Sequence, residues 1–222
     1  MAVKVDFLKQ TAYFSGLSPA ALDSIAKLVF EKKVDRSEIF VLEGGTEDVL
    51  YIVASGAAKM FKTSAEGKEQ ILSIARPGDS VNDVAVFDGG PNLVAAQAMS
   101  PVVLYGLSKS HLEKILVEYP QVANNVIKVL ANRVRYLVSL VEDLSFKHVI
   151  GRIAKILLQY GSGAESGQRL TQQDMAAMAG TVREVVGRSL KVLEEEKAIK
   201  LDHHRIIITD EEALKRIIEE PS

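Results

Sequence analysis

The apolar residues between Pro120 and Leu144 recur at the spacing of one long helix. One track alternates steps of three and four residues, as the a and d positions of a heptad repeat do. A second track runs through Val126, Val129, Val138 and Leu140 and gives the helix another side to bury. The first track, which we call the seam, comprises Ile127, Leu130, Val134, Leu137, Val141 and Leu144. The pattern predicts a helix that packs on its own domain and on a second copy of the chain, or else a single core helix buried on two sides.

Between Val34 and Leu107 the pattern changes to short β-rich runs, which are separated by turns rich in Gly, Pro and Asp. Runs this closely spaced predict a compact antiparallel roll or barrel. A short amphipathic helix should precede the roll, with Ser18 as its capping residue and Pro19 in its first turn. A second short helix is expected over residues 108–118, directly before the long helix.

The last third of the chain predicts helices followed by a hairpin. Residues 149–157 carry apolar positions at helical spacing, and residues 171–193 contain two capping-box patterns, Thr171 with Asp174 and Thr181 with Glu184. Gly180 lies between the two patterns and can adopt the left-handed conformation of a tight turn. The run AIKLDHHRIIITD then predicts a two-stranded hairpin whose turn is Asp202 to Arg205. This order is typical of a winged helix-turn-helix.

The fold class is therefore α+β, with an N-terminal antiparallel β-roll, a long helix and a C-terminal winged helix-turn-helix. We expect the roll and its flanking helices over residues 1–119, the dimerisation helix and hinge over 120–145, and the winged helix-turn-helix over 146–222.

Composition narrows the classes of function. The chain is 47% hydrophobic and 25% charged, and it contains no apolar run long enough to span a membrane, so we expect a soluble cytoplasmic protein. The absence of cysteine excludes disulfides, cysteine-ligated iron-sulfur clusters and thiolate zinc sites. The net charge is −2, so any site for nucleic acid must be local. No Walker loop or G-x-S-x-G elbow is present, and we predict neither an enzyme nor a bound cofactor.

The second helix of the helix-turn-helix should present on its outer side Arg183, Glu184, Gly187, Arg188 and Lys191. Arginine suits guanine edges and glutamate suits the cytosine amino group in a major groove. The further predicted DNA contacts are Thr171, Thr181, Lys191, Lys200 and Arg205. The alternatives are a helical hairpin with a surface ion pair and a winged helix used for protein interaction. The adjacent His203 and His204 favour a solvated or phosphate-facing turn over a metal site, because adjacent side chains diverge.

The order of roll, long helix and winged helix-turn-helix, with RPGDSV in the roll and GTVREVVGRSLKVLEEEKAI in the recognition segment, resembles the Crp-Fnr superfamily of bacterial transcription regulators. The pattern Arg-Glu-x-x-x-Arg at Arg183, Glu184 and Arg188 is similar to the catabolite activator branch. The resemblance implies a homodimer on a palindromic DNA site with TGTGA-like half-sites, activation of transcription, and RNA polymerase as a partner. The missing cysteines exclude the iron-sulfur branch.

The sequence departs from that family at the cyclic-nucleotide pocket. Where the family has Gly-Glu-Leu and then Arg-Ser or Arg-Thr, this chain has Asn82-Asp83-Val84 and Leu93-Val94. Leucine cannot neutralise a phosphate, so we expect no binding of cyclic AMP. An effector, if one is needed, should lie near Val84, Phe87, Leu93, Val94, Arg133 and Tyr136; alternatively, the protein's own side chains fill the pocket and it binds DNA constitutively. Haem on His111 or His148 is a further alternative.

Overall fold

The computed structural model describes residues 5–160, 170–202 and 205–219. The chain divides into two compact units. The first comprises Met1–Lys62 and Leu72–Val134, and the second comprises Thr63–Ile71 and Arg135–Ser222. Each unit is described by itself below.

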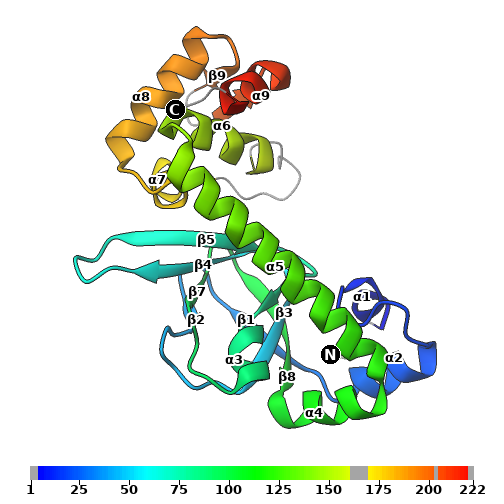
Figure 1. The fold of residues 1–222 in the computed structure, drawn as a ribbon. Coiled ribbons are helices and arrows are strands. Elements are labelled where there is room, and N and C mark those ends of the chain that lie inside the picture. Colours follow the sequence, from blue (N-terminus) through cyan, green and yellow to red (C-terminus); the bar gives the residue numbers. More distant parts are fainter. Residues whose placement is uncertain (1–4, 161–169, 203–204, 220–222) are drawn as a thin grey trace. The chain divides into compact units, whose positions relative to one another are not determined.

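Two four-stranded antiparallel sheets form the roll (Figure 1). One sheet has the order β1-β8-β3-β6 and the other β2-β7-β4-β5. Consecutive strands therefore often lie in different sheets, as expected of a roll, and the predicted β-rich runs are confirmed. The strands are β1 (Phe30–Val34), β2 (Ile39–Val41), β3 (Val49–Ser55), β4 (Ala58–Thr63), β5 (Glu69–Ala75), β6 (Ser80–Val81), β7 (Ala95–Ala98) and β8 (Val102–Ser108).

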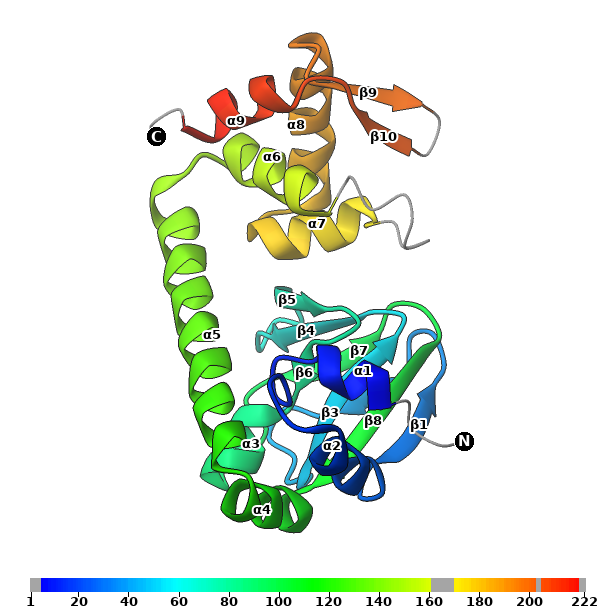
Figure 2. The ribbon, with the colours of Figure 1, turned by 90° about the vertical axis from the view of Figure 1, so that its right-hand side faces the viewer.

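Helices cover one end of the roll and form a core there that is separate from the core between the two sheets. They are α1 (Val5–Gln10), α2 (Pro19–Ala26), α4 (Lys109–Glu118) and the N-terminal part of α5 (Pro120–Phe146), and Figure 2 shows α2 and α4 at the same end of the roll. Leu22 of α2, Ile115 of α4 and Val122 of α5 meet in this core. The Ser18 side chain accepts a hydrogen bond from Ala21 N, so the predicted cap of α2 is confirmed. The predicted long helix is also confirmed.

A short helix that the sequence pattern did not predict, α3 (Asp83–Asp88), interrupts the strands of the roll. Asn82 precedes it with a φ of 67°, and the Asn82 side chain donates to the carbonyl oxygens of Glu47 and Val49. Six residues are too few to display helical periodicity, which explains why this element was missed. Because this helix begins at Asp83, the Asp83 side chain lies at a helix start, where it is buried.

The second unit holds the winged helix-turn-helix. Its elements are α6 (Val149–Tyr160), α7 (Gln172–Ala179), α8 (Arg183–Glu195), β9 (Ile199–Asp202), β10 (Arg205–Ile208) and α9 (Glu211–Glu219). Apolar residues of α6, α7 and α8 form its core, among them Ile153, Met175 and Leu190. The helix α9 was not predicted. His203 and His204, for which a metal site was considered, lie outside the described residues. None of the described helices is long and apolar enough to cross a membrane.

Candidate nucleic-acid interface and effector region

The first helix of the helix-turn-helix begins and ends as its sequence predicts. The Thr171 Oγ1 atom accepts a hydrogen bond from Asp174 N at 3.1 Å, and Thr171 N donates to Asp174 Oδ2 at 2.9 Å, which completes a capping box. Gly180 ends α7 with a φ of 66°. Thr181 N donates to Ala176 O at 3.0 Å and holds the turn closed. The direction in which α8 leaves this turn is therefore fixed by backbone hydrogen bonds.

One side of α8 is buried and the other carries charged residues. Val186, Leu190 and Leu193 pack in the core of the unit. Arg183, Glu184, Arg188 and Lys191 are all exposed, as predicted. Three of these four residues lie in the first two turns of the helix, which is the part that enters the major groove in helix-turn-helix proteins.

The predicted capping box between Thr181 and Glu184 is wrong. The helix begins one residue later than expected, so its N-cap residue is Val182, which offers no side-chain cap. A capping box needs a polar residue three positions after the N-cap, and that position is Val185. Thr181 is half-buried, whereas Glu184 is exposed and takes no part in capping the helix.

The wing, residues 199–208, is tied to the end of α8. Leu201 N donates to the Glu194 carboxylate at 2.7 Å, and β9 pairs with β10 from Ile199 to Asp202. Lys200 and Arg205 are exposed on the two strands. Two basic side chains, those of Lys200 and Arg205, thus lie on a hairpin that is hydrogen-bonded to α8, the recognition helix.

A buried carboxylate, Asp83, organises the region where the effector was expected. Its side chain is 1% exposed and forms an ion pair with Arg133 of α5. The hydroxyl groups of Tyr13 and Ser80 donate to Asp83 Oδ2 at 2.8 and 2.9 Å. Burial, together with the charge of Asp83, raises the pKa of Tyr13 well above its ordinary value, so the phenol stays neutral and donates its proton.

This network corrects the prediction that Arg133 is available to an effector. A buried carboxylate is stable only if a cation and hydrogen-bond donors compensate its charge. Arg133 supplies that cation, and its Nη2 also donates to the Ser80 carbonyl oxygen at 3.3 Å. Asp83, in turn, faces Arg133 and does not lie open to a ligand.

The other predicted effector residues do not all come together. Phe87 stacks on Tyr13 with ring centroids 6.4 Å apart, and Val94 packs against the core between the sheets. Val84 is half-buried, and Leu93 is 55% exposed. Tyr136 belongs to the second unit. Phe87 and Val94 thus pack against different cores of the first unit, and the structure does not bring the predicted effector residues together as one site.

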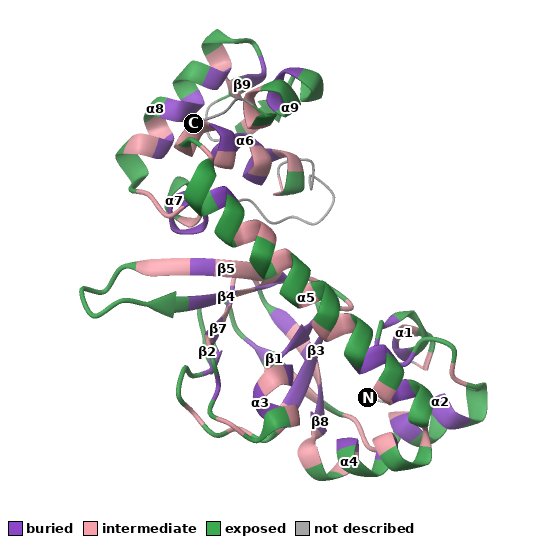
Figure 3. Cartoon of the chain, in the orientation of Figure 1, coloured by how far each residue is buried: buried purple, intermediate pink, exposed green. Residues whose placement is uncertain are grey.

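Most of the seam on α5 is exposed, as the exposed colour along much of this helix in Figure 3 indicates. Ile127, Val134, Leu137, Val141 and Leu144 are 38% to 64% exposed. Leu130 differs, because it packs in part against the core beneath the helices. Val138 was predicted to face its own domain and is instead 63% exposed. At 3.6 residues per turn it lies roughly 120° around the helix from the buried Val126.

Two domain families match the chain. Residues 31–119 match the cyclic nucleotide-binding domain, and residues 151–217 match the Crp-like helix-turn-helix domain. The chain belongs to the Crp-Fnr superfamily. It is a transcription regulator of this family, with both of its characteristic domains.

Relatives of this Crp-Fnr regulator match over nearly their whole length. The CRP-like cAMP-activated global transcriptional regulator of Mycobacterium tuberculosis is 29% identical over 219 residues, which cover 95% of this chain and 98% of the relative. The cyclic AMP receptor protein of Thermus thermophilus is 28% identical, with the same coverage. The structure of FixK2 from Bradyrhizobium japonicum is similar in fold, with a TM-score of 0.77 at 23% identity over 87% of this chain and 99% of that one.

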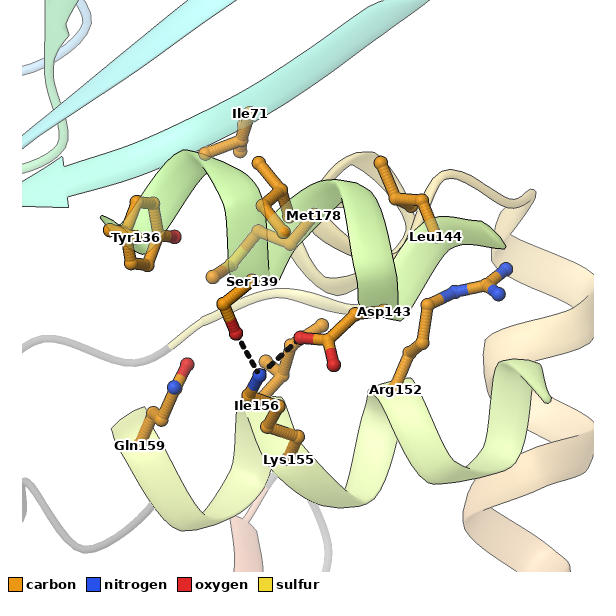
Figure 4. A pocket seen from close by; sticks show the side chains of 11 residues that line it. Ile71, Tyr136, Ser139, Asp143, Leu144, Arg152, Lys155, Ile156, Gln159 and Met178 are labelled. Atoms are coloured by element: carbon orange, nitrogen blue, oxygen red, sulfur yellow. Dashed lines mark hydrogen bonds and ion pairs between the residues drawn. The ribbon is translucent and has the colours of Figure 1, made fainter. Parts of the chain in front are cut away.

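A site that sequence reasoning missed lies where α5 meets α6 (Figure 4). Asp143 pairs with Lys147 at 2.8 Å and with Lys155, whose Nζ also donates to Ser139 Oγ at 3.2 Å. Burial alone would raise the pKa of Asp143, but hydrogen bonds from the two lysines outweigh it and lower that pKa. Asp143 lies on the predicted long helix, but Lys147 lies beyond its predicted end at Leu144. Lys155 comes from the next helix, so sequence spacing did not bring the three residues together.

Arg152 connects the junction of α5 and α6, which we call the elbow, to the helix-turn-helix of this Crp-Fnr regulator. Its Nε donates to Ala179 O, at the end of α7, at 2.8 Å, and its Nη1 donates to Lys147 O at 2.6 Å. Burial lowers the pKa of Arg152, and the charge of Asp143 opposes that shift. Within the second unit, Arg152 thus joins the end of α5 to the end of α7.

Proposed function

We propose that this Crp-Fnr regulator is a cytoplasmic homodimer that binds double-stranded DNA in a sequence-specific manner. The observation that carries the proposal is the side of α8 on which Arg183, Glu184 and Arg188 are exposed, opposite a buried face that anchors the helix. Since the chain as a whole has a net charge of −2, binding depends on this local arrangement and not on overall charge.

In this proposal the residues of the helix-turn-helix divide their roles. Arg183 and Arg188 donate to guanine edges and Glu184 accepts from a cytosine amino group, on half-sites similar to TGTGA. The remaining polar residues position the protein on the phosphates. They are Thr171, Thr181, Lys191, Lys200 and Arg205.

The exposed seam of α5 supports the dimer. A stripe of five large apolar side chains in water is unfavourable and marks an interaction surface. A second copy meets it by two-fold symmetry, which presents two recognition helices to an inverted repeat with half-site centres ~34 Å apart. Activation through contact with RNA polymerase is the mode of action we propose.

The proposed regulation differs from that of the relatives named as cAMP-activated. Leu93 offers no charge to a cyclic phosphate, and Arg133 is already paired with Asp83. Because the hydrogen bonds among Tyr13, Ser80, Asp83 and Arg133 satisfy the buried carboxylate, the side chains of the protein itself stabilise this region. We therefore favour DNA binding without an effector. A small-molecule signal at the apolar surface near Val84 and Leu93 is the second candidate.

Selection of bound sequences from a random DNA pool by the purified protein tests this proposal. We expect an inverted repeat whose half-sites contain guanine and cytosine at the positions read by Arg183, Glu184 and Arg188. Recovery of no shared sequence would contradict it and would favour a winged helix used for protein interaction. The same preparation tests haem, because a colourless protein that binds its site fully without additives needs neither haem nor another effector.

A further inference from the structure

The residue that begins the recognition helix is one that helix stability does not explain. Val182 is the N-cap of α8, with φ −114° and ψ 156°, and makes no side-chain hydrogen bond to the helix. Serine, threonine, aspartate and asparagine are strongly preferred at this position because their oxygen accepts from a free backbone N–H, and valine is among the least favourable choices. The first turn of α8 is therefore less stable than its backbone geometry would permit.

Val182 also gains little by packing. Its side chain is 52% exposed, although the neighbouring apolar residue Val186 is completely buried. Its carbonyl oxygen accepts from Val185 N and Val186 N at 3.0 and 3.2 Å, so its backbone starts the hydrogen bonding of the helix. An apolar group thus stands in solvent at the end of the helix where Arg183 and Glu184 are also exposed.

The surroundings of this end of α8 in a DNA complex give the valine a partner. In a helix-turn-helix the N-terminal residues of the second helix contact base edges in the major groove. The apolar feature of that groove is the 5-methyl group of thymine, and aliphatic side chains recognise it by contact. Adjacent Cα atoms are about 3.8 Å apart, and neighbouring base pairs are about 3.4 Å apart along the DNA axis. Val182 is therefore close enough to Arg183 to meet a base pair next to the one that Arg183 reads.

We propose that Val182 is a specificity-determining residue that contacts the 5-methyl group of a thymine beside the base pairs read by Arg183 and Glu184. The inference rests on the proposed DNA-binding function. Discrimination comes from the valine methyl groups, which become buried against the thymine methyl and cannot satisfy a polar base edge.

The test is to replace each thymine of the selected site by uracil, which removes only the methyl group. Burial of one methyl group is worth about fourfold in affinity. With both half-sites substituted, we expect the wild-type protein to bind about fifteenfold more weakly at one thymine position. Val182→Ser should bind the thymine and uracil sites equally while keeping its preference at the guanine positions.

Two controls separate this contact from a change in folding. Val182→Ser should unfold at the same temperature as the wild type or a higher one, because serine restores the cap. Val192→Ser alters a valine of α8 that is 42% exposed, far from the N-cap, and should leave the sensitivity to uracil unchanged. If Val182→Ser folds poorly, Val182→Asn, which offers a capping oxygen but no methyl group, is measured in its place and should also lose the discrimination.

The outcomes distinguish this inference from the proposed function. A wild-type protein that selects a sequence yet tolerates uracil at every thymine overturns the role of Val182 and leaves DNA reading intact. Equal sensitivity of the wild type and Val182→Ser overturns it as well. A protein that selects no sequence overturns the proposed function, and the inference fails with it.

Discussion

Replacing Val134 and Val141 together by glutamate should convert the protein to a monomer. Both residues lie on the exposed seam of α5, at 60% and 63% exposure. Full burial of an apolar side chain of this size is worth about 1.5 to 3 kcal/mol, so covering the exposed part of each valine adds about 1 kcal/mol. Four such side chains meet in a symmetric dimer, which amounts to about 4 kcal/mol or about a thousandfold in Kd. Repulsion between carboxylates adds to this loss.

Sedimentation equilibrium over a range of protein concentrations measures this change directly. Val117→Glu is the matched control, because Val117 is 84% exposed on α4, lies outside the seam and receives the same substitution. Leu130 is unsuitable for this test, since it packs in part on the core of the roll and its replacement would also destabilise the fold. A double variant that dimerises with the Kd of the wild type would refute the interface.

Three further predictions concern the roll and the elbow. Arg133→Met should destabilise the protein by about 3 to 5 kcal/mol in urea unfolding, because it leaves Asp83 buried and unpaired, and Asp83→Asn in the same chain should restore most of that stability. Asp143→Asn should lower stability by about 1 to 2 kcal/mol at neutral pH. Folding lowers the pKa of Asp143 below 3.8, so its contribution to stability is complete above that pH and is lost as the pH falls through the folded pKa. On acidification, Asp143→Asn should therefore lose less stability than the wild type. An equal loss in both proteins would contradict this. Calorimetric titration with cyclic AMP should give no binding at physiological concentrations, and micromolar affinity would disprove our interpretation of Leu93.

The periodic parts of this fold were predictable from the sequence. The long helix, the β-rich runs and the capping box at Thr171 each repeat or pair over short distances, so local rules suffice. The helix α3 was too short to show a period, and the start of α8 was placed one residue early because Thr181 and Glu184 matched a capping pattern that the turn does not use.

The polar networks could not be predicted, because their members come from distant segments. Tyr13 and Asp83 are 70 residues apart, and Arg133 lies another 50 residues further along the chain. A sequence can show that Asp83 is acidic, but only the packing of α3 against α5 makes it a buried carboxylate that requires Arg133. The same limit applies to Lys155, which reaches Asp143 from the next helix.

In the proposed complex, α8 reads bases while the wing contacts the phosphate backbone. The most direct measurement compares Arg188→Ala and Lys200→Ala on the selected site and on each of its single-base variants, at several salt concentrations. We expect Arg188→Ala to lose about 1 to 3 kcal/mol of discrimination at one base pair, and Lys200→Ala to weaken binding to all sequences alike and to reduce the salt dependence. Equal losses on every variant for Arg188→Ala would contradict base reading by this helix.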